Sequence, residues 1–420
     1  MNIVFVHQNF PGQFKHVVPA MVAEGTHRVA AFTMTDAPRG PRGVMTVTYR
    51  PGRANAKGVH PWVSDFESKV IRGEVAMRAA RKVRDEHGFV PEVIVAHPGW
   101  GESLFLKDVW PRARLLLYSE WYYPLQGADT GFDPEFSAPG EEAICRLRVK
   151  NAHNLLSFEE ADAAVTPTRW QWSTHPAWFR ERVRVIHDGI DTGFVRRAAG
   201  LKGLKLAIPA DEGCGIAAGE ARLLPGEEIV TFVNRNLEPY RGYHIFMRAL
   251  PELLRRRPKA KVVIVGGNET SYGARPPSGT WKQRFLDEVR GDIDLSRVHF
   301  VGKIPYPAFL HLLQLATVHI YLTYPFVLSW SLLEAMACET AIVASDVAPV
   351  REVMTDGESG RLVGFFDGTA LVERICELLD DPVQRARLGR AARQRVVEHY
   401  DLKSRCLPQQ LALIREVAAG

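Results

Sequence analysis

The chain alternates between short apolar runs and longer stretches in which apolar residues recur at helical spacing. In the first half the apolar runs occupy residues 2–6, 28–32, 93–96, 115–118 and 163–166. In the second half they occupy residues 229–233, 261–265, 298–301, 318–322 and 341–344. Helical patterns lie between them, for example at 74–86, 243–256 and 307–315. Short apolar strands separated by helices are typical of parallel sheets covered on both faces, so the pattern predicts an α/β protein.

The two groups of strands indicate two domains. The alternation breaks between residues 191 and 228, where Gly, Pro and Ala are dense and apolar periodicity is lost. We predict a doubly wound, Rossmann-like domain at 1–195, a linker at 196–226, a second such domain at 227–400 and a final helical segment at 401–420. Ligands of doubly wound sheets bind at the carboxyl ends of the strands, so we expect the site in a cleft between the domains.

The composition excludes several classes of protein. The 420 residues are 46% hydrophobic and 24% charged, which excludes a mostly disordered chain. The five cysteines are scattered without a C-x-x-C pair, which argues against a disulfide scaffold or a zinc ribbon and fits a reducing compartment. A net charge of +5 is small for a nucleic-acid binder. Because a signal-peptide pattern and a long uncharged apolar stretch are both missing, we expect a cytoplasmic protein, with peripheral membrane contact left open.

Two arginines lie six residues apart after the strand predicted at 229–233. Arg235 and Arg241 belong to the loop and the start of the helix that follow this strand. Anions are commonly held at such places by helix N-terminal amides and fixed cations, and an arginine can donate to two phosphate oxygens at once. For two isolated arginines taken alone, solvated surface charges are the favoured interpretation, because most charged side chains lie at the surface.

A helix is predicted to begin near Ser329, in the segment Ser-Trp-Ser-Leu-Leu-Glu-Ala-Met-Ala-Cys. Its first turn would offer backbone N–H groups to a phosphate. Glu334 lies just over one turn inside the helix, where a carboxylate can accept hydrogen bonds from both hydroxyls of a ribose. An unpartnered glutamate among apolar neighbours is costly, which favours a ligand role over an ordinary solvated glutamate.

Taken together, these motifs resemble those of the retaining GT-B glycosyltransferases of family 4, over nearly the whole chain. The first half contributes residues 6–14 (Val-His-Gln-Asn-Phe-Pro-Gly-Gln-Phe), His97 and residues 185–192 (Val-Ile-His-Asp-Gly-Ile-Asp-Thr). The second half contributes Arg235-x5-Arg241-Gly, residues 298–303 (Val-His-Phe-Val-Gly-Lys) and residues 333–337 (Leu-Glu-Ala-Met-Ala). The resemblance implies an acceptor-side first domain, a second domain that binds the nucleotide sugar, and a last helix that crosses back onto the first domain.

The resemblance also implies roles for individual residues. Arg235 and Arg241 would neutralise the diphosphate leaving group, and His97, after the strand at 93–96, would lie near the transferred sugar. The implied donor-binding residues are Gly12, Gly302, Lys303, Ile304, Ser329, Trp330, Leu333 and Glu334, of which Glu334 would bind the ribose.

An acceptor patch is proposed after the strand at 115–118. It comprises Glu120, Trp121 and Tyr122 after that strand, together with Gln13 from the segment after the first strand. Aromatic faces beside a carboxylate suit the stacking of a sugar and the recognition of its hydroxyls. Aromatic packing between domains is at least as good an explanation of these rings.

The chain departs from the family pattern at one notable position. The first Glu of the family's E-x7-E motif, which contacts the donor sugar's hydroxyls, corresponds to Phe326 here. After the helix, Glu339 and Thr340 replace the usual Gly-x-Pro. The identity of the donor sugar is therefore open, whereas the phosphate and ribose anchors are unaffected.

We expect a retaining, metal-independent glycosyltransferase that needs no cofactor. Its partners would be a nucleotide-diphospho-sugar and a carbohydrate, lipid-linked, small-molecule or protein hydroxyl acceptor, without nucleic acid. The alternatives are a nucleotide-sugar epimerase or hydrolase of the same fold, or a sugar-nucleotide-binding protein weakened by Phe326.

Other classes fit the sequence less well. A metal-dependent transferase would use the D-x-D of Asp292 and Asp294, but these precede a strand and fit an acidic turn. A dehydrogenase would need a G-x-G-x-x-G loop that the chain lacks. The basic helix face at 78–84 fits anionic lipid, and a solvated face is the favoured interpretation.

Overall fold

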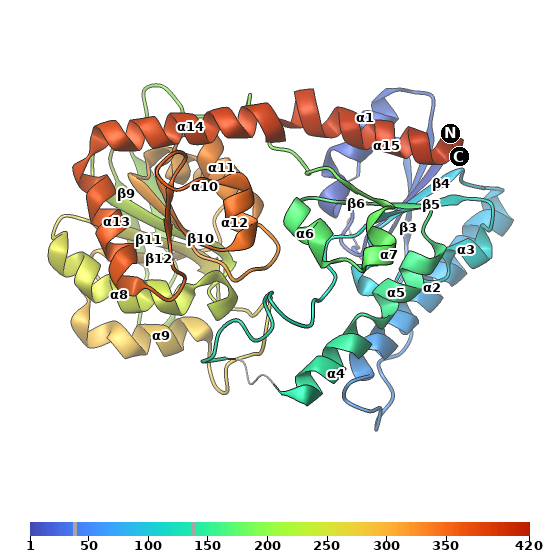
Figure 1. Ribbon diagram of the computed structural model, residues 1–420, viewed down its shortest axis with the longest axis horizontal. Helices are drawn as coiled ribbons and strands as arrows, with labels where there is room; N and C mark the ends of the chain where they lie inside the picture. The colour runs from blue at the N-terminus through green and yellow to red at the C-terminus, as the bar shows by residue number, and fades with distance from the viewer. Residues whose placement is uncertain (37–39, 137–139) are drawn as a thin grey trace. The chain divides into compact units, whose positions relative to one another are not determined.

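The computed structural model describes residues 1–36, 40–136 and 140–420, which form two compact units (Figure 1). Unit 1 comprises Met1–Thr130, the described part of Ala138–Gly189, and Leu402–Gly420. Unit 2 comprises Ile190–Asp401 and residues 131–136. Each unit is built around a parallel sheet, as the alternation of apolar runs and helices predicts.

Unit 1 contains a seven-stranded parallel sheet in the order β3-β2-β1-β4-β5-β6-β7. Chain order runs outward in one direction from β1 to β3 and in the other from β4 to β7. Loops that follow β1 and β4 therefore emerge on either side of a topological switch point. The strands are β1 Asn2–Val6, β2 Arg28–Thr33, β3 Val44–Thr48, β4 Val93–Ala96, β5 Arg114–Tyr118, β6 Ala163–Thr166 and β7 Val183–Val185.

Helices of several lengths complete unit 1. They are η1 Gly12–Lys15, α1 Val17–Ala23, α2 Ser64–His87, η2 Pro98–Trp100, α3 Leu106–Val109, α4 Glu141–Lys150, α5 Ala152–Glu160, α6 Arg169–Thr174, α7 Ala177–Arg180, the π-helical turn η6 Leu402–Cys406 and α15 Leu407–Ala419.

Unit 2 contains a six-stranded parallel sheet in the order β12-β11-β10-β13-β14-β15. Here the switch point lies between β10 and β13. The strands are β10 Ile229–Asn236, β11 Lys261–Gly267, β12 Val298–Gly302, β13 Val318–Tyr321, β14 Ile342–Ser345 and β15 Arg361–Val363. The helices are η3 Glu212–Cys214, η4 Pro239–Arg241, α8 Tyr243–Arg256, α9 Trp281–Val289, η5 Arg290–Asp292, α10 Tyr306–Leu315, α11 Trp330–Ala337, α12 Ala348–Val353, α13 Gly368–Asp380 and α14 Pro382–Tyr400.

The segment 196–226, predicted as an irregular linker, is instead folded as part of unit 2. It forms an antiparallel pair of strands, β8 Leu204–Ile208 and β9 Gly219–Leu223. Leu206, Ala221 and Leu223 are buried in the core of this unit. The expectation was wrong because the apolar residues alternate with period two over only five residues in each strand, and abundant glycine and alanine around them hide the signal.

The C-terminal helix α15 supplies part of the core of unit 1. Its residues Leu413, Ile414 and Val417 belong to the same buried cluster as residues of β1, β4 and β5. Burying each such side chain contributes about 1.5–3 kcal/mol. The last helix is therefore integral to unit 1, although more than two hundred residues separate α7, which ends at Arg180, from the η6–α15 segment.

Three arginines of α14 stabilise the ends of neighbouring helices in unit 2. Arg393 donates to the carbonyl of Ala337 at the end of α11 (2.6 Å), and Arg395 donates to the carbonyl of Glu352 near the end of α12 (2.9 Å). Arg385 donates to carbonyls near the end of α13. Cations at helix C-termini satisfy carbonyls without an intrahelical partner and complement the helix dipole.

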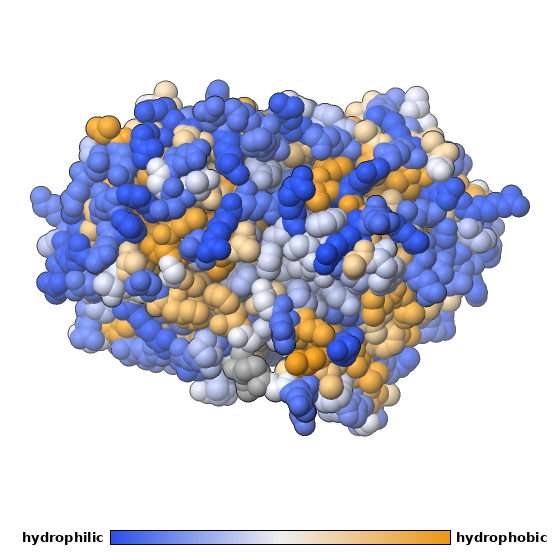
Figure 2. Space-filling view, viewed as in Figure 1, coloured by the Kyte–Doolittle hydropathy of each residue, from blue (hydrophilic) through white to orange (hydrophobic). Residues whose placement is uncertain are grey.

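Figure 2 shows mainly hydrophilic side chains on the viewed face, interrupted by groups of hydrophobic ones. Among the described residues, the most exposed large apolar side chains are Val383, Phe194 and Leu224. These come from separate parts of the chain, as is usual for isolated apolar residues at a protein surface.

Candidate functional site

The loops after β1, β4 and β5 bring a polar network together near the switch point of unit 1. The Nε2–H of His7 donates to Oε1 of Gln13 at 2.6 Å, and Nε2 of Gln13 donates to Oε1 of Glu120 at 3.1 Å. The Nδ1 atom of His7 accepts from the backbone N–H of Asn9. Burial and the neighbouring His97 lower the pKa of His7 to about 3, so this imidazole is neutral at physiological pH. The predicted acceptor residues Gln13 and Glu120 are therefore tied into one network.

His97 lies immediately after β4 and is 4% exposed. Its Nδ1 accepts from the backbone N–H of Gly99 at 3.1 Å, which places the ring N–H at Nε2. The ring stacks on Trp100, with centroids 4.3 Å apart. Nε2 lies 3.8 Å from Oε2 of Glu120 and makes no hydrogen bond to another described residue. A buried N–H without a hydrogen-bond partner is available to a ligand oxygen.

The pKa of Glu120 is lowered despite its burial. Burial acts to raise it, but the interactions with His97 and Gln13 outweigh burial. Glu120 is therefore a carboxylate at neutral pH and an acceptor for hydroxyl groups.

Gly12 is required by local geometry. Its φ is +48°, and a Cβ on this residue would lie 2.2 Å from Cε1 of His7. Any side chain would push the His7 imidazole out of the network with Gln13. The sequence singled out this glycine for contact with the donor, and the structure gives it this additional reason.

The two aromatic residues of the predicted acceptor patch are largely packed into the protein. Trp121 is 8% exposed, and its ring centroid lies 6.4 Å from that of Trp170. Tyr122 is half-buried and packs against the core of unit 1, with Phe158 at 6.1 Å. Packing within unit 1 accounts for both rings, and an acceptor role for them stays a prediction.

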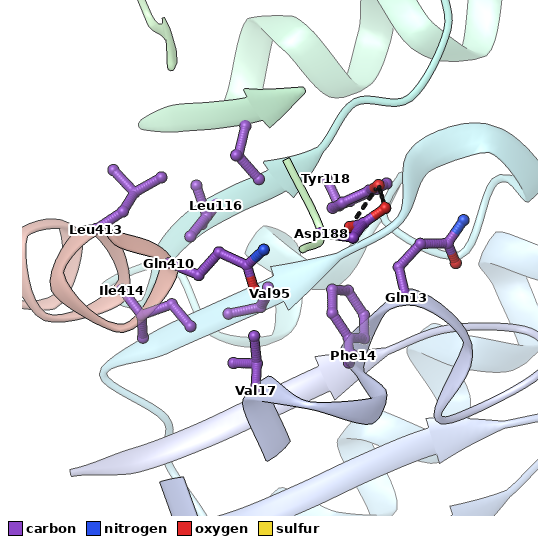
Figure 3. A pocket seen from close by; sticks show the side chains of 11 residues that line it. Gln13, Phe14, Val17, Val95, Leu116, Tyr118, Asp188, Gln410, Leu413 and Ile414 are labelled. Carbon is purple, nitrogen blue, oxygen red and sulfur yellow. Dashed lines mark hydrogen bonds between the residues drawn. The ribbon is translucent and has the colours of Figure 1, made fainter. Parts of the chain in front are cut away.

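Beside this network, a mostly apolar pocket lies in unit 1 between the sheet, α15 and the segment that carries η1 and α1 (Figure 3). Val95 and Leu116 of the sheet and Ile414 of α15 are among its apolar walls. At one end the hydroxyl of Tyr118 lies 2.8 Å and 2.9 Å from the two carboxylate oxygens of Asp188. Gln13 lines the pocket and also belongs to the network described above, so the two features adjoin.

In unit 2, Arg241 is held at the switch point between β10 and β13. Its guanidinium donates to Oγ1 of Thr323 at 2.8 Å and to the carbonyl of Val327 at 3.0 Å. It is 6% exposed, and its Cζ lies 5.2 Å from the ring centroid of Tyr272 and 5.9 Å from that of Phe326. Among the described residues no carboxylate forms an ion pair with it. A nearly buried guanidinium held by neutral groups keeps its full positive charge for an anionic ligand.

Arg235 is near the carboxyl end of β10, which extends three residues further than the sequence predicts. Its side chain is exposed, and within the described ranges no hydrogen bond or ion pair ties it to another residue. Near the carboxyl end of β10 the structure therefore has two arginines: Arg241, which is fixed by hydrogen bonds, and Arg235, which is exposed.

Glu238, which the sequence analysis did not single out, lies between these two arginines in the chain. It is fully buried, and its Oε2 accepts from the backbone N–H groups of Ser271 and Tyr272 at 3.0 and 2.9 Å. Its Oε1 is buried without a hydrogen-bond partner among the described residues. Burial raises the pKa of Glu238 to about 7, although Arg241 and Arg235 both act to lower it. A single glutamate in a loop carries no sequence signal for such an environment.

The start of α11 matches the prediction from the sequence. Ser329 is the N-cap residue, and its Oγ accepts from the backbone N–H of Ser331 at 3.3 Å. Trp330 is half-buried against the core of unit 2, and Leu333 is fully buried within it. The side chain of Leu333 therefore serves packing, whereas Ser329 and Trp330 stand at the helix N-terminus.

Glu334 lies in α11 and is 8% exposed. The hydroxyl of Tyr306, the first residue of α10, donates to its Oε1 at 2.6 Å. This interaction satisfies part of the hydrogen-bonding capacity that a buried carboxylate requires. The sequence identified the glutamate but not this partner, which lies 28 residues earlier.

The loop between β12 and α10 carries the other three predicted donor-binding residues. Gly302 has a φ of +64°, which favours glycine there. Nζ of Lys303 pairs with Oε2 of Glu269 at 3.1 Å, with both side chains largely exposed. Ile304 is half-buried against the core of unit 2. Such an exposed pair contributes little to stability, so the ammonium group can exchange Glu269 for a ligand.

Phe326, which replaces the family's glutamate, belongs to an aromatic cluster beside Arg241. Its ring centroid lies 5.0 Å from Tyr272 and 5.6 Å from Tyr240, and the side chain is 6% exposed. Tyr240 in turn lies 4.7 Å from Tyr324. The position next to the guanidinium is therefore apolar and uncharged.

The D-x-D segment forms the acidic turn that the sequence favours. Oδ1 of Asp294 accepts from the N–H and the hydroxyl of Ser296, and Oδ2 accepts from Arg297 just before β12. Within residues 1–36, 40–136 and 140–420, no group of three or more His, Cys, Asp or Glu is placed to hold a metal ion.

The basic face of α2 is interleaved with carboxylates. Arg78 pairs with Glu74 at 2.6 Å, and Arg84 pairs with Asp85 at 2.8 Å. These ion pairs reduce the positive charge that the helix offers to anionic lipid. No helix in the described part of the chain is long and apolar enough to cross a bilayer.

Two family models match the chain, one in each half. Residues 25–195 match the glycosyl transferase family 4 group, and residues 218–395 match the glycosyl transferases group 1. Together these matches take in both of the parallel sheets described above, apart from strand β1.

Curated relatives agree with these matches. A phosphatidyl-myo-inositol mannosyltransferase of Mycolicibacterium smegmatis is 31% identical over 223 residues, which are 51% of this chain and 53% of the relative. A D-inositol 3-phosphate glycosyltransferase of Streptomyces avermitilis is 29% identical over 261 residues, or 60% and 50% of the two chains. The chain thus spans about half the length of the curated relatives it matches.

Solved structures share the fold over almost the whole chain. The sucrose-phosphate synthase of Thermosynechococcus elongatus superposes with a TM-score of 0.71 at 19% identity, covering 100% of this chain and 99% of the other. HepE of Anabaena, solved in complex with UDP-glucose, gives 0.63 at 16% identity and 99% coverage of both chains. These likenesses show the GT-B fold.

Proposed function

Because the chain belongs to the group 1 glycosyltransferases, we propose that it transfers a hexosyl group from a nucleotide-diphospho-sugar to an acceptor hydroxyl, with retention and without a metal ion. The acceptor would be a carbohydrate, a lipid-linked molecule, a small molecule or a protein. UDP-glucose in the HepE complex and the mannosyltransferase name of a relative support a hexose donor.

The observation that carries this proposal is the environment of Arg241. A nearly buried guanidinium, held by Thr323 and the carbonyl of Val327 and paired with no described carboxylate, stands at the switch point of a doubly wound sheet. The exposed Arg235 adds a second positive charge near the same strand end. Fixed cations of this kind stabilise the negative charge that develops on a departing diphosphate.

Transfer would proceed in one displacement on one face of the sugar. The bond between the anomeric carbon and the diphosphate oxygen breaks, and the acceptor oxygen bonds to the same carbon from the same side. The acceptor proton passes to the departing phosphate oxygen. The diphosphate therefore leaves with a proton and with its charge balanced by Arg235 and Arg241, so a side-chain nucleophile is not needed.

Other residues would bind the rest of the donor and the acceptor. Glu334 would accept hydrogen bonds from the ribose hydroxyls, and the N-terminal amides of α11 would contact the diphosphate. In unit 1, the Nε2–H of His97 would donate to the transferred sugar, and the carboxylate of Glu120 would accept from an acceptor hydroxyl.

The test compares Arg241→Ala with Arg248→Ala. Arg248 serves as the control because it forms exposed ion pairs with Glu135 and Glu288 elsewhere in unit 2. Nucleotide sugars with uridine, guanosine and adenosine diphosphate would be incubated with a panel of acceptors. Arg241→Ala should reduce turnover at least about a hundredfold, whereas Arg248→Ala should not.

The same assays separate the alternatives. Conversion of the donor into its epimer, or hydrolysis that acceptors never outcompete, would replace the proposed transfer with another reaction of the same fold. Binding of a nucleotide sugar without turnover would identify a binding protein. Loss of turnover in the presence of a chelator would contradict metal independence.

A further inference from the structure

Tyr306 connects the two loops of unit 2 to which donor-binding roles are assigned. It is the first residue of α10 and follows the loop of Gly302, Lys303 and Ile304. Its hydroxyl donates to Oε1 of Glu334, which lies one turn inside α11. The 2.6 Å separation lies in the range expected when a hydroxyl donates to a charged carboxylate.

The carboxyl of Glu334 needs such a partner. All of its nearest neighbours along the helix, from Leu332 to Ala337, are apolar and fully buried. A carboxylate in this setting can rotate about its side-chain bonds unless a hydrogen bond fixes it. Tyr306 fixes the direction of one carboxylate oxygen.

The tyrosine remains a donor at all relevant pH values. Its pKa is raised, first by burial of the hydroxyl and then by the negative charge of Glu334. The phenol therefore stays protonated and donates to the carboxylate in one direction only.

The ring of Tyr306 contributes little to the core. Its residue is 46% exposed, and its ring packs on Phe309 at 5.9 Å and on the exposed Phe194 at 6.5 Å. A tyrosine that served stability alone would bury its ring. Here the hydroxyl is directed at a carboxylate, in a partly buried hydrogen bond.

We propose that Tyr306 is a positioning residue that orients the carboxylate of Glu334 to receive the two adjacent hydroxyls of a ribose. This inference rests on the proposed function, because it assigns the ligand of Glu334 to a nucleoside diphosphate. It adds a specificity element: the protein would discriminate between ribonucleotides and nucleotides that lack the 2′ and 3′ hydroxyls, and Tyr306 would supply part of that discrimination.

The test measures binding by calorimetry with the full chain. The probes are uridine, guanosine and adenosine diphosphate and their 2′,3′-dideoxy counterparts. Tyr306→Phe keeps the ring and removes the hydroxyl, so folding should be preserved. The variant should bind the ribonucleoside diphosphate preferred by the unaltered protein with about tenfold lower affinity, which is the scale of one hydrogen bond to a charged group. The affinity for the 2′,3′-dideoxy counterpart should change by no more than about twofold, because this nucleotide lacks the hydroxyls from which Glu334 would accept hydrogen bonds.

Two further variants sharpen the comparison. Glu334→Gln should weaken ribonucleotide binding, and adding Tyr306→Phe to it should have little further effect, because the two residues act through one carboxylate. Tyr243→Phe is the matched control. It removes a hydroxyl that donates to the carbonyl of Lys282 in the same unit, and it should leave both affinities unchanged.

Each failure has a distinct meaning. If Tyr306→Phe weakens ribonucleotides and dideoxynucleotides equally, its role is structural and the inference is wrong. If it changes neither, the hydroxyl does not position Glu334. If none of the three diphosphates binds to the unaltered protein, the proposed function itself fails, and the inference fails with it.

Discussion

The guanidinium carbon of Arg241 lies 5.9 Å from the centre of the Phe326 ring. Phe326 occupies the sequence position at which the family that the chain resembles has the first glutamate of its E-x7-E motif. Among the described residues no carboxylate forms an ion pair with Arg241, although Glu238 interacts with it electrostatically, and the cation gains a favourable interaction with the face of the Phe326 ring. The arrangement favours an anionic ligand at Arg241 over internal charge neutralisation.

Phe326→Glu tests this arrangement. A carboxylate at this position would pair with Arg241 and cancel part of its charge, so affinity for nucleoside diphosphate should fall by about tenfold. Phe326→Gln is the control for lost packing, and it should weaken binding less. Calorimetry at two salt concentrations measures both variants. Equal losses of nucleotide affinity in Phe326→Glu and Phe326→Gln would show that lost packing, and not the added charge, weakens binding.

His97→Ala separates the roles of the two units. His97, whose Nε2–H makes no hydrogen bond to another described residue, belongs to unit 1, whereas the proposed diphosphate anchors Arg235 and Arg241 belong to unit 2. The variant should lower kcat by about tenfold or more, because a hydrogen bond to the transferred sugar is lost. The Kd for nucleoside diphosphate should remain within about twofold. A matching loss of nucleotide affinity would contradict this division.

Glu238 should make stability depend on pH. Burial raises the pKa of its carboxyl in the folded protein to about 7, above the ordinary value of 4.5 for an unfolded chain. The folded state therefore binds more protons between these values. The stabilisation associated with the protonated form is fully present below pH 4.5 and is lost as the pH rises through 7.

Thermal unfolding of Glu238→Gln from pH 5 to 8 measures this contribution. The unaltered protein should lose stability relative to the variant as the pH rises, since glutamine does not titrate. Glu252→Gln, which changes an exposed residue of α8 paired with Arg255, is the control. Parallel curves for Glu238→Gln and the unaltered protein would disprove the prediction.

Glu339→Gly should stabilise unit 2. Glu339 has a φ of 59° in a Schellman motif at the end of α11, where its N–H donates to Met336 and the N–H of Thr340 donates to Ala335. Glycine adopts this conformation without strain, and the expected gain is about 0.5–1 kcal/mol after its greater unfolded-state entropy. The weak contact of Glu339 with Arg393 at 3.8 Å is lost in the process.

Glu339→Ala provides the comparison. Alanine also loses the contact with Arg393 but keeps the Cβ that makes the conformation unfavourable. The thermal midpoint should therefore rise for glycine and fall or stay unchanged for alanine. A fall for both variants would show that the contact with Arg393 outweighs the backbone strain.

The sequence predicts those features that a local pattern can encode. The parallel strands around each switch point and the N-cap at Ser329 follow from apolar runs and capping residues, and the structure confirms them. The sequence analysis missed strands β8 and β9 because an apolar alternation of only five residues, surrounded by glycines, is a weak signal. The last three residues of strand β10 were missed because they are polar and carry no apolar signal, although Asn236 pairs with Gly267 of β11.

The partners within the site depend on contacts far apart in the chain. Glu334 was identified from its apolar helix, but the tyrosine that binds it begins another helix. In the sequence Glu238 cannot be told from other loop glutamates, because its burial and its hydrogen bonds from the N–H groups of Ser271 and Tyr272 arise only in the folded chain. The roles of His97, Arg235 and Arg241 in catalysis stay predictions until a ligand or a variant tests them.

Helix α15 decides how unit 1 can be produced separately. A recombinant fragment that stops at residue 189 would lack Leu413, Ile414 and Val417, and it would present bare aliphatic surface of β1, β4 and β5 to water. Such a fragment should aggregate on purification. Joining residues 402–420 to residue 189 through a short flexible linker should restore solubility. The helix can then pack on the sheet even though the residues between 189 and 402 are missing.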